Sequence, residues 1–267
     1  MRRARQLATV FLLLVALASA AAGFLAPSGY AHQFRDTPDA SPSRQHWLGT
    51  DDLGRDRFAR LLYGTRVSLC LAPAAALLSS LLAALIGGVA GFCGGRLEQL
   101  VLAGTDLFLS LPWLFLLITI RALLPLNLPP VTSVVITFML LGCLGWAVAA
   151  RVICSDAHLL RNCDFILLAR ASGLGGWRLL VRHLLPNLMP IVYAQFWLSI
   201  PIFILTEANL GILGLGVSEP LPSWGTLLRD LESCSSMSHL WQFAPLLLLI
   251  AAVSCFHLLV VDREFPA

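Results

Sequence analysis

Six long apolar stretches dominate this sequence, and they restrict what it can fold into more than any other feature. A helix that crosses a bilayer needs about 20 mostly apolar residues, and six segments meet or nearly meet that length: 7–26, 67–92, 100–124, 131–150, 188–210 and 241–261. Charged residues make up only 12% of the chain, about half the share of a soluble domain. So little charge cannot cover a water-facing surface. The sequence therefore predicts an all-α integral membrane protein with about six transmembrane helices.

Three prolines and a signal-like start affect how those stretches are interpreted. Pro73, Pro112 and Pro201 lie inside three of them, where proline is tolerated because neighbouring helices satisfy the freed backbone groups. The first stretch follows the basic positions 1–5, and Ala18-Ser-Ala20 resembles a signal-peptidase site. Cleavage there would leave five spans. Retention as an anchor is favoured because the apolar run continues well past that site.

The polar segments divide the chain into four parts. We expect an N-terminal transmembrane helix over residues 1–27, an external loop over 28–66, a five-helix core over 67–261 and a tail over 262–267. Within the core, a long polar loop covers 151–187, and shorter connections cover 93–99, 125–130 and 214–240. Ten of the 18 basic residues fall on the N-terminal side of the membrane, including the cluster at positions 2, 3 and 5. Basic residues mark the cytoplasmic side, so both termini are expected there.

Several function classes lack their signatures in this sequence. The net charge of +3 is spread out, without the basic face of a protein that binds nucleic acid. The seven cysteines include no C-x-x-C pair, so neither a metal site nor another cofactor is expected. The G-x-x-x-x-G-K-[ST] loop that cradles phosphates is absent, as are the H-E-x-x-H and G-x-S-x-G motifs of hydrolases. An enzyme is therefore disfavoured, and a secondary transporter, which usually carries inverted repeats, stays as an alternative.

The segment 164–190 combines helical and turn signals. Ala169, Arg170 and Ala171 favour a helix, and the glycines at 173, 175 and 176 interrupt it. A helical pattern resumes at 177–185, with one apolar face made of Leu180, Leu184 and Leu185. Such a helix–turn–helix between two spans can dock its apolar face into a groove of a partner protein. The pattern is equally typical of a helix that rests on lipid headgroups.

Seven stretches of this chain resemble the permease subunits of binding-protein-dependent ABC importers. Counted back from His-Leu-Leu-Pro-Asn at 183–187, the segment described above is similar to their EAA loop. Similar stretches follow the family's order along nearly the whole chain, at 46–56, 60–68, 91–95, 106–112, 213–216 and 222–225. The subfamily resembled is the second permease of dipeptide, oligopeptide and nickel importers. The chain departs from it at Leu167-Leu168, where the family has Glu-Ala, and at 260–263, where the family has a Gly- and Asp-rich stretch.

The resemblance implies a permease fold in the bacterial inner membrane, with 151–187 as the cytoplasmic coupling loop. It implies that the chain forms half of a translocation pathway for peptides or similar small solutes. The implied partners are a second permease, two ATP-binding subunits that supply the energy, and an extracytoplasmic binding protein that docks on the external loops. A divergent, weakly active permease is a further alternative because of the departures. The implied ATPase-coupling residues are Ala169, Arg170, Ala171, Gly173, Leu174, Trp177 and Arg178.

Four further features carry expectations. Asp106 and Glu207 lie in or beside spans, where carboxylates are costly, so each is expected either to line the pathway or to make hydrogen bonds between helices. Arg121 is expected to extend from a span end to the headgroups. Glycines at 87, 91 and 95 form two overlapping G-x-x-x-G spacings, which permit close helix packing. Arg170 is expected to pair with an acidic group of the ATPase or with a lipid headgroup.

Overall fold

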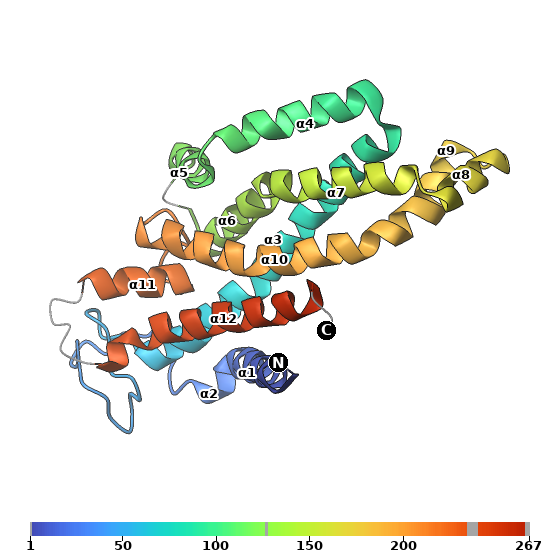
Figure 1. The fold of residues 1–267 in the computed structure, drawn as a ribbon. Coiled ribbons are helices and arrows are strands. Elements are labelled where there is room, and N and C mark those ends of the chain that lie inside the picture. The colour runs from blue at the N-terminus through green and yellow to red at the C-terminus, as the bar shows by residue number, and fades with distance from the viewer. Residues whose placement is uncertain (1, 126–127, 234–239, 265–267) are drawn as a thin grey trace. The chain divides into compact units, whose positions relative to one another are not determined.

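The computed structural model describes residues 2–125, 128–233 and 240–264 (Figure 1). Every regular element of these residues is helical, and two isolated β-bridges lie in the segment before α3. The helices are α1 (Arg2–Ala20), α2 (Ala22–Leu25), α3 (Arg57–Cys93), α4 (Gly95–Ser110), α5 (Trp113–Leu123), α6 (Pro130–Leu144), α7 (Trp146–Arg161), α8 (Asp164–Ala171), α9 (Gly176–Leu179), the π-helical turn η1 (Leu180–Leu184), α10 (Leu185–Ile212), α11 (Trp224–Ser233), the 3-10 turn η2 (Leu240–Phe243) and α12 (Ala244–Glu264).

The helices confirm the predicted fold class. Five helical runs are long and apolar enough to cross a membrane, and the number is six if the bent pair α4–α5 counts as one span. Helices extend further than the apolar stretches do: α3 begins ten residues before 67, and α7 continues through Arg161. The predicted external loop therefore ends at Asp56, and the predicted loop 151–187 is mostly helical. Residues 126–127, 234–239 and 265–267, which belong to two predicted connections and the predicted tail, lie outside the described residues.

Pro112 bends the third predicted span, in contrast to the other two prolines. α4 ends at Ser110, α5 begins at Trp113, and the two helix axes differ by 79°. Leu111 has an extended backbone (φ −81°, ψ 131°), which is the conformation that a following proline imposes. Pro73 and Pro201 instead stay within α3 and α10. The expectation of one helix over 100–124 was therefore wrong in its geometry.

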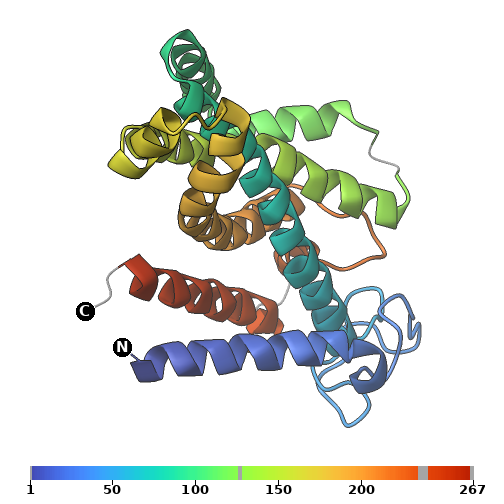
Figure 2. The same ribbon diagram turned by 90° about the vertical axis from the view of Figure 1, so that its right-hand side faces the viewer.

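The chain divides into two compact units, and each is described by itself. The first unit comprises residues 1–72, 118–138 and 200–267. Within it, α1 packs along α12, and α11 also contacts α12. α1 and α12 run antiparallel, so the start of α1 and the end of α12 lie at the same end of the pair (Figure 2).

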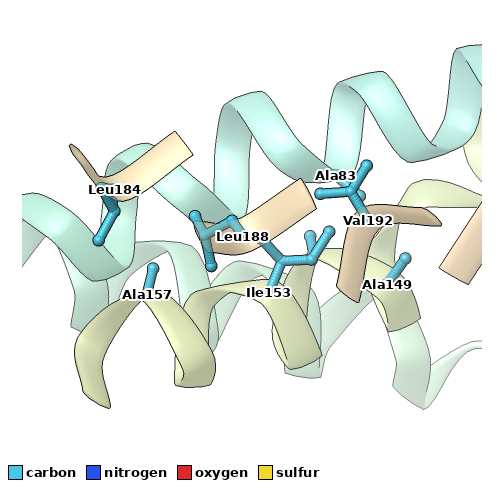
Figure 3. Packing of buried hydrophobic residues seen from close by; sticks show 8 residues of the cluster. Ala83, Ala149, Ile153, Ala157, Leu184, Leu188 and Val192 are labelled. Atoms are coloured by element: carbon cyan, nitrogen blue, oxygen red, sulfur yellow. The ribbon is translucent and has the colours of Figure 1, made fainter. Parts of the chain in front are cut away.

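The second unit, residues 73–117 and 139–199, is built around α7. Its core is made of small and aliphatic side chains from α3, α7, η1 and α10 (Figure 3): Ala83, Ala149, Ala150, Ile153, Ala157, Leu184, Leu188 and Val192. A Cβ atom added at Gly87 or Gly91 would collide with the backbone oxygen of Ala150 or Cys154. The backbones of α3 and α7 therefore touch at these two glycines, as the glycine spacing predicted.

The predicted turn at 93–99 is much shorter in the structure. Gly94 alone separates α3 from α4, with a positive φ of 68° that favours glycine. Gly95 is already the first residue of α4, and a Cβ atom there would meet nothing within 4 Å. The third glycine of the predicted spacing thus belongs to the turn, and it takes no part in helix packing.

Candidate functional sites

The coupling loop predicted from the sequence forms a helical hairpin, α8 and α9, in the second unit. α8 ends in a glycine-dependent cap: Gly173 has φ 82°, its N–H donates to Arg170 O (3.1 Å), and the Leu174 N–H donates to Ala169 O (3.2 Å). These two bonds are those of a Schellman motif, which satisfies the last carbonyls of a helix and reverses the chain. The predicted helix–glycine turn–helix is confirmed, and Gly173 is its pivot.

Two of the seven predicted coupling residues point into the hairpin. Ala169 is buried together with Ile166 and Leu179, and Leu174 packs against this cluster. Their contacts hold α8 against α9. The other five are exposed: Arg170, Ala171, Gly173, Trp177 and Arg178.

The outer surface of the hairpin is apolar and basic. Leu168 is 68% exposed and Trp177 is 75% exposed, and they lie on α8 and α9. Arg170 is exposed and has no acidic partner among the described residues. Leu168 was treated in the sequence only as a departure from the family pattern. The exposure of Leu168 shows that it places an apolar side chain on the outer surface of the hairpin, close to the glycine cap.

A π-helical turn joins the hairpin to α10 and changes which leucines are buried. In η1 each hydrogen bond joins residues five apart, and in an α-helix it joins residues four apart. The residue one turn after Leu179 is therefore Leu184, and in an α-helix it would be His183. Leu179, Leu184 and Leu188 are consequently buried, whereas Leu185 is 39% exposed. The predicted face of leucines 180, 184 and 185 was therefore wrong at Leu185, because it assumed a regular α-helix.

Asp106, a predicted pathway residue, lies on the surface of the second unit. It forms a salt bridge with Arg151 of α7, and about half of each side chain is exposed. Arg151 was expected in a loop, but α7 includes it. A second pair, Glu98 of α4 with His158 of α7 (2.9 Å), lies along the same two helices. Both pairs orient α4 on α7.

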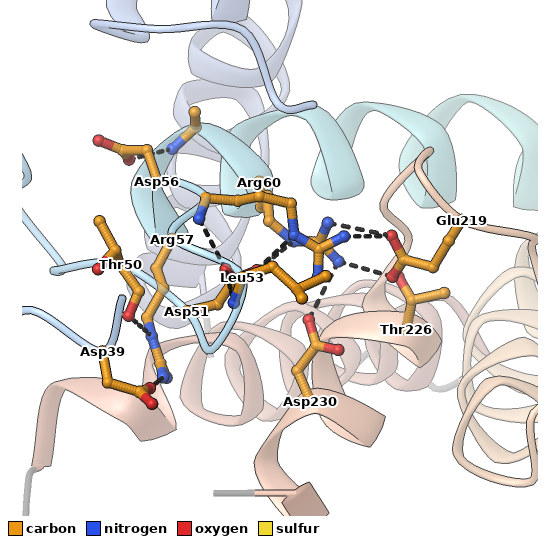
Figure 4. Close-up of polar contacts among 12 residues, drawn as sticks. Asp39, Thr50, Asp51, Leu53, Asp56, Arg57, Arg60, Glu219, Thr226 and Asp230 are labelled. Carbon is orange, nitrogen blue, oxygen red and sulfur yellow. Dashed lines mark hydrogen bonds and ion pairs between the residues drawn. The ribbon is translucent and has the colours of Figure 1, made fainter. Parts of the chain in front are cut away.

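In the first unit, Arg60 is the centre of a network that the sequence analysis missed (Figure 4). The Arg60 side chain is 1% exposed, and its Nη2 lies 2.9 Å from Glu219 Oε1 and 3.0 Å from Asp230 Oδ2. Arg55 joins the same cluster, because Nη1 donates to Glu219 Oε2 (2.6 Å) and Nε to Asp51 Oδ2 (2.6 Å). The network thus ties the segment before α3 to the loop before α11. These are two of the stretches that the sequence assigned to the external side.

The two carboxylates that accept hydrogen bonds from Arg60, those of Glu219 and Asp230, have opposite pKa shifts. Burial opposes ionisation of Glu219, but the guanidinium groups of Arg60 and Arg55 outweigh it and lower its pKa from 4.5. Burial raises the pKa of Asp230 above its ordinary 3.8, and the attraction of Arg60 does not fully offset it. The network therefore holds Glu219 as an anion.

Acid should weaken this network through Glu219. A carboxylate whose pKa is lowered in the folded state stabilises the fold above its ordinary pKa, and the contribution is lost as the pH falls through the lowered value. We expect the unfolding midpoint of the wild-type chain to drop between pH 5 and pH 3 by more than that of Glu219→Gln. The charge of Glu219 also acts on Asp230, so the difference between the two chains reports Glu219 together with its coupling to Asp230. Parallel midpoint curves would contradict this assignment.

Glu207, the second predicted pathway residue, is fully buried among hydrogen-bond donors. Ser223 Oγ donates to its Oε1 (2.6 Å), and Ser68 Oγ lies 3.4 Å from its Oε2. Trp224 completes the contact, donating its backbone N–H to Ser68 and its indole N–H to Thr65 (2.9 Å). These bonds join α3, α10 and the start of α11. Of the two roles left open by the sequence, this geometry favours hydrogen bonding between helices.

The sequence analysis expected Arg121 to extend to the lipid headgroups, and this expectation was wrong. Its side chain is buried, at 2% exposure. Nη2 donates to Ser133 Oγ (3.0 Å) and lies 3.4 Å from Gly216 O. It therefore lies among α5, α6 and the loop before α11.

A family model described as "Binding-protein-dependent transport system inner membrane component" matches residues 83–262, well over half of the chain. The chain belongs to this family. The permease is therefore a membrane subunit of an ABC importer, as the ordered motifs predicted.

Individual relatives place the permease more closely. It is 32% identical to the dipeptide transport system permease protein DppC of Bacillus subtilis, over 95% of this chain and 78% of the relative. It is 36% identical to the nickel transport system permease protein NikC of Escherichia coli K12, over 95% and 89%. Identity to the glutathione transport system permease protein GsiD of Pectobacterium atrosepticum is 30%, over 94% and 82%. The permease thus belongs to the dipeptide, oligopeptide and nickel branch that its motifs resemble.

Proposed function

We propose that the hairpin α8–α9 is the part of the permease that an ATP-binding subunit grips. The observation that carries this is its construction: a packed inner side closed by Ile166, Ala169 and Leu179, and an outer side that presents exposed Trp177 and Arg170. Tryptophan and arginine are enriched among the residues that contribute most to protein contacts. The inner packing makes the hairpin stiff enough to transmit force.

Movement of the hairpin would reach the spans through α10. The hairpin continues into α10 through η1 without a break, so a displacement of α9 shifts the start of α10. Closure of two ATP-binding subunits would then tilt spans and alternate access to the pathway, a rigid-body switch between two packings. ATP hydrolysis is assigned to those partners because the phosphate-cradling loop is absent from this sequence.

The assembly proposed is a second, different permease, two ATP-binding subunits and an extracytoplasmic binding protein. The permease would form half of the pathway, with the hairpin and both termini on the cytoplasmic side of the inner membrane. The adjacent ends of α1 and α12 agree with a shared side for the termini. Asp106 is the better candidate for the pathway of the two carboxylates, because it is exposed. Peptides or similar small solutes are the proposed cargo, since relatives are named for dipeptide, nickel and glutathione transport.

Reversing the charge of Arg170 tests the docking role. We expect Arg170→Glu to reduce co-purification of the ATP-binding subunits about tenfold or more, because it removes a cation from the contact and adds a repulsive charge. Uptake should fall in parallel while the amount of permease in the membrane stays the same. Arg66→Glu, another exposed arginine, on α3, is the matched control and should keep normal co-purification.

The competing outcomes are distinct in this experiment. Unchanged co-purification and uptake in Arg170→Glu would refute the docking role of the hairpin surface. Uptake by the permease without any ATP-binding subunit, driven by an ion gradient, would favour the secondary transporter instead. Reduced membrane insertion of both variants would indicate a folding defect. The amount of co-purified ATP-binding subunit is therefore divided by the amount of inserted permease.

A further inference from the structure

The last turn of α3 is capped by an arginine of another helix. Arg161, the last residue of α7, donates from Nη1 to Cys93 O (3.0 Å) and to Phe92 O (3.5 Å). The carbonyls at the end of an α-helix have no partner within the helix, and they form the negative end of its dipole. A guanidinium satisfies these carbonyls and is attracted by the dipole. Arg161 therefore binds the end of α3 to the end of α7, within the second unit.

Gly94 leaves the space that Arg161 occupies. It is buried, and a Cβ atom there would overlap Arg161 Nη1. Its neighbour Gly95 has a similar positive φ, 61° compared with 68°, but a Cβ atom on Gly95 would meet nothing within 4 Å. The two glycines thus share a backbone requirement, and only Gly94 is also needed to admit the guanidinium.

The α8–α9 hairpin contacts the same turn of α3. Phe92 packs against the apolar cluster that closes the hairpin, which consists of Ile166, Ala169 and Leu179. The same side chain packs against the core of the second unit. One aromatic side chain of α3 is therefore shared between the hairpin and the core.

A short link holds the hairpin to the end of α7. Asn162 and Cys163 are the two residues between α7 and α8, and their N–H groups donate back to Leu159 O (3.2 Å) and Leu160 O (3.0 Å). Arg161 directly precedes this link. A displacement of α8 is therefore passed to the residue that caps α3.

We propose that Arg161 is a positioning residue that makes α3 follow the movement of the hairpin. The inference rests on the proposed docking of an ATP-binding subunit to the hairpin. Apolar packing of Phe92 is non-directional and permits sliding, whereas the hydrogen bonds of Arg161 restrict both distance and angle. α3 is one of the candidate spans. Through Arg161 the hairpin thus moves a second span besides α10.

The test measures amide hydrogen exchange in the full-length permease, assembled in lipid nanodiscs with its partner permease and the ATP-binding subunits. Exchange reports local opening of helices, and it is compared with and without the ATP analogue AMP-PNP. In the wild type we expect AMP-PNP to change exchange both in the hairpin, residues 164–179, and at the end of α3, residues 88–93. In Arg161→Met the response of the hairpin should remain, and that of α3 should fall about fivefold or more, the lower end of typical coupling between sites.

This comparison separates positioning from simple stabilisation. Methionine keeps an apolar stem beside Gly94 and removes the donors. If Arg161 only stabilised the fold, exchange in Arg161→Met would be faster in both states, and the response of α3 to AMP-PNP would persist. Arg161→Lys should restore that response, because both hydrogen bonds come from one nitrogen, which an ammonium can replace. Arg96→Met changes an exposed arginine of α4 and should respond as the wild type does.

The two glycines provide a second test that leaves Arg161 in place. Gly94→Ala and Gly95→Ala both put alanine at a positive φ, so their backbone strain is similar. Only Gly94→Ala places a Cβ atom where the guanidinium lies. We expect Gly94→Ala to lose the response of α3 as Arg161→Met does, and Gly95→Ala to keep it. If Arg161→Met does not fold, this pair decides the question.

Two results would overturn the proposal. One is a wild type in which AMP-PNP changes exchange in the hairpin but not at the end of α3. The other is an undiminished response of α3 in Arg161→Met and in Gly94→Ala. Failure of the proposed function looks different, because AMP-PNP would then change neither segment of the wild type, and the coupling role of Arg161 would fall with it.

Discussion

Gly91→Ala is expected to destabilise the permease by about 3 kcal/mol or to prevent its insertion. The added Cβ atom would collide with Cys154 O and lie 2.8 Å from the Ala157 Cβ atom. Because the obstacle is backbone, no side-chain rotation relieves it, and α3 must separate from α7. Overpacking of a tight core typically costs 1–3 kcal/mol, and separating α3 from α7 would also loosen the adjacent core that contains Ala150 and Ile153. Thermal unfolding of the purified chain, with the inserted fraction measured in membranes, gives the magnitude.

Gly88→Ala is the control, with the same substitution three residues away on the same helix. Its Cβ atom would meet only Leu188 Cδ1 at 3.6 Å and Ile153 Cγ2 at 4.0 Å, which are ordinary contacts. Alanine is also the better helix former by about 1 kcal/mol. We expect an unfolding midpoint at or slightly above that of the wild type. If both variants behaved alike, the close approach of α3 and α7 at Gly91 would be refuted.

Arg60→Met should cost about 3 kcal/mol, comparable to other losses of one partner from a buried charge cluster. Methionine keeps much of the length and apolar volume of arginine but removes all donors. Glu219, Asp230 and Asp51 would then repel one another without the cation they share. The partial exposure of Glu219 and Asp230 limits the cost, because water screens part of the repulsion. The readouts are the unfolding midpoint and the protease sensitivity of the segment before α3.

A second change distinguishes charge from packing in this cluster. Adding Glu219→Gln to Arg60→Met removes one of the stranded anions, so the double variant should be more stable than Arg60→Met alone. Neighbouring residues are expected to show such coupling. Arg66→Met replaces an exposed arginine of the same helix and should change little. A double variant that is less stable than Arg60→Met by the full effect of the single Glu219 change would mean that the two groups act independently.

The spans could be predicted from the sequence, because hydropathy is a property of a segment by itself. The response to proline could not. Pro112 ends a helix while Pro73 and Pro201 continue theirs, although all three lie in similar apolar surroundings in the sequence. Whether a neighbour supplies the missing support is decided by tertiary contacts.

Polar contacts between distant segments were the larger omission. The sequence analysis assigned the arginines and aspartates of residues 28–66 to an external loop, but Arg60 and Asp51 are buried. Their partners include Glu219, 159 positions from Arg60, and no local pattern reveals a pair so far apart. Arg121 was misjudged for the same reason, since its contacts to Ser133 and Gly216 come from other elements. By contrast, the α8–α9 hairpin was predictable because its glycine cap is local.

The π-helical turn η1 holds one residue more than a turn of α-helix, so it sets the rotation of α9 relative to α10. If η1 reverted to α-helical bonding, the segment before it would turn by about 100°, the rotation of one residue. The position now occupied by Leu179 would pass to a neighbour, either Arg178 or Leu180, and the contact with Ile166 would be lost. The spacing of five residues between the buried Leu179 and Leu184 therefore fits the π-helical turn and the rotation of α9 that it sets. A one-residue deletion within 180–183 would rotate the outer surface of the hairpin away from any partner that binds it.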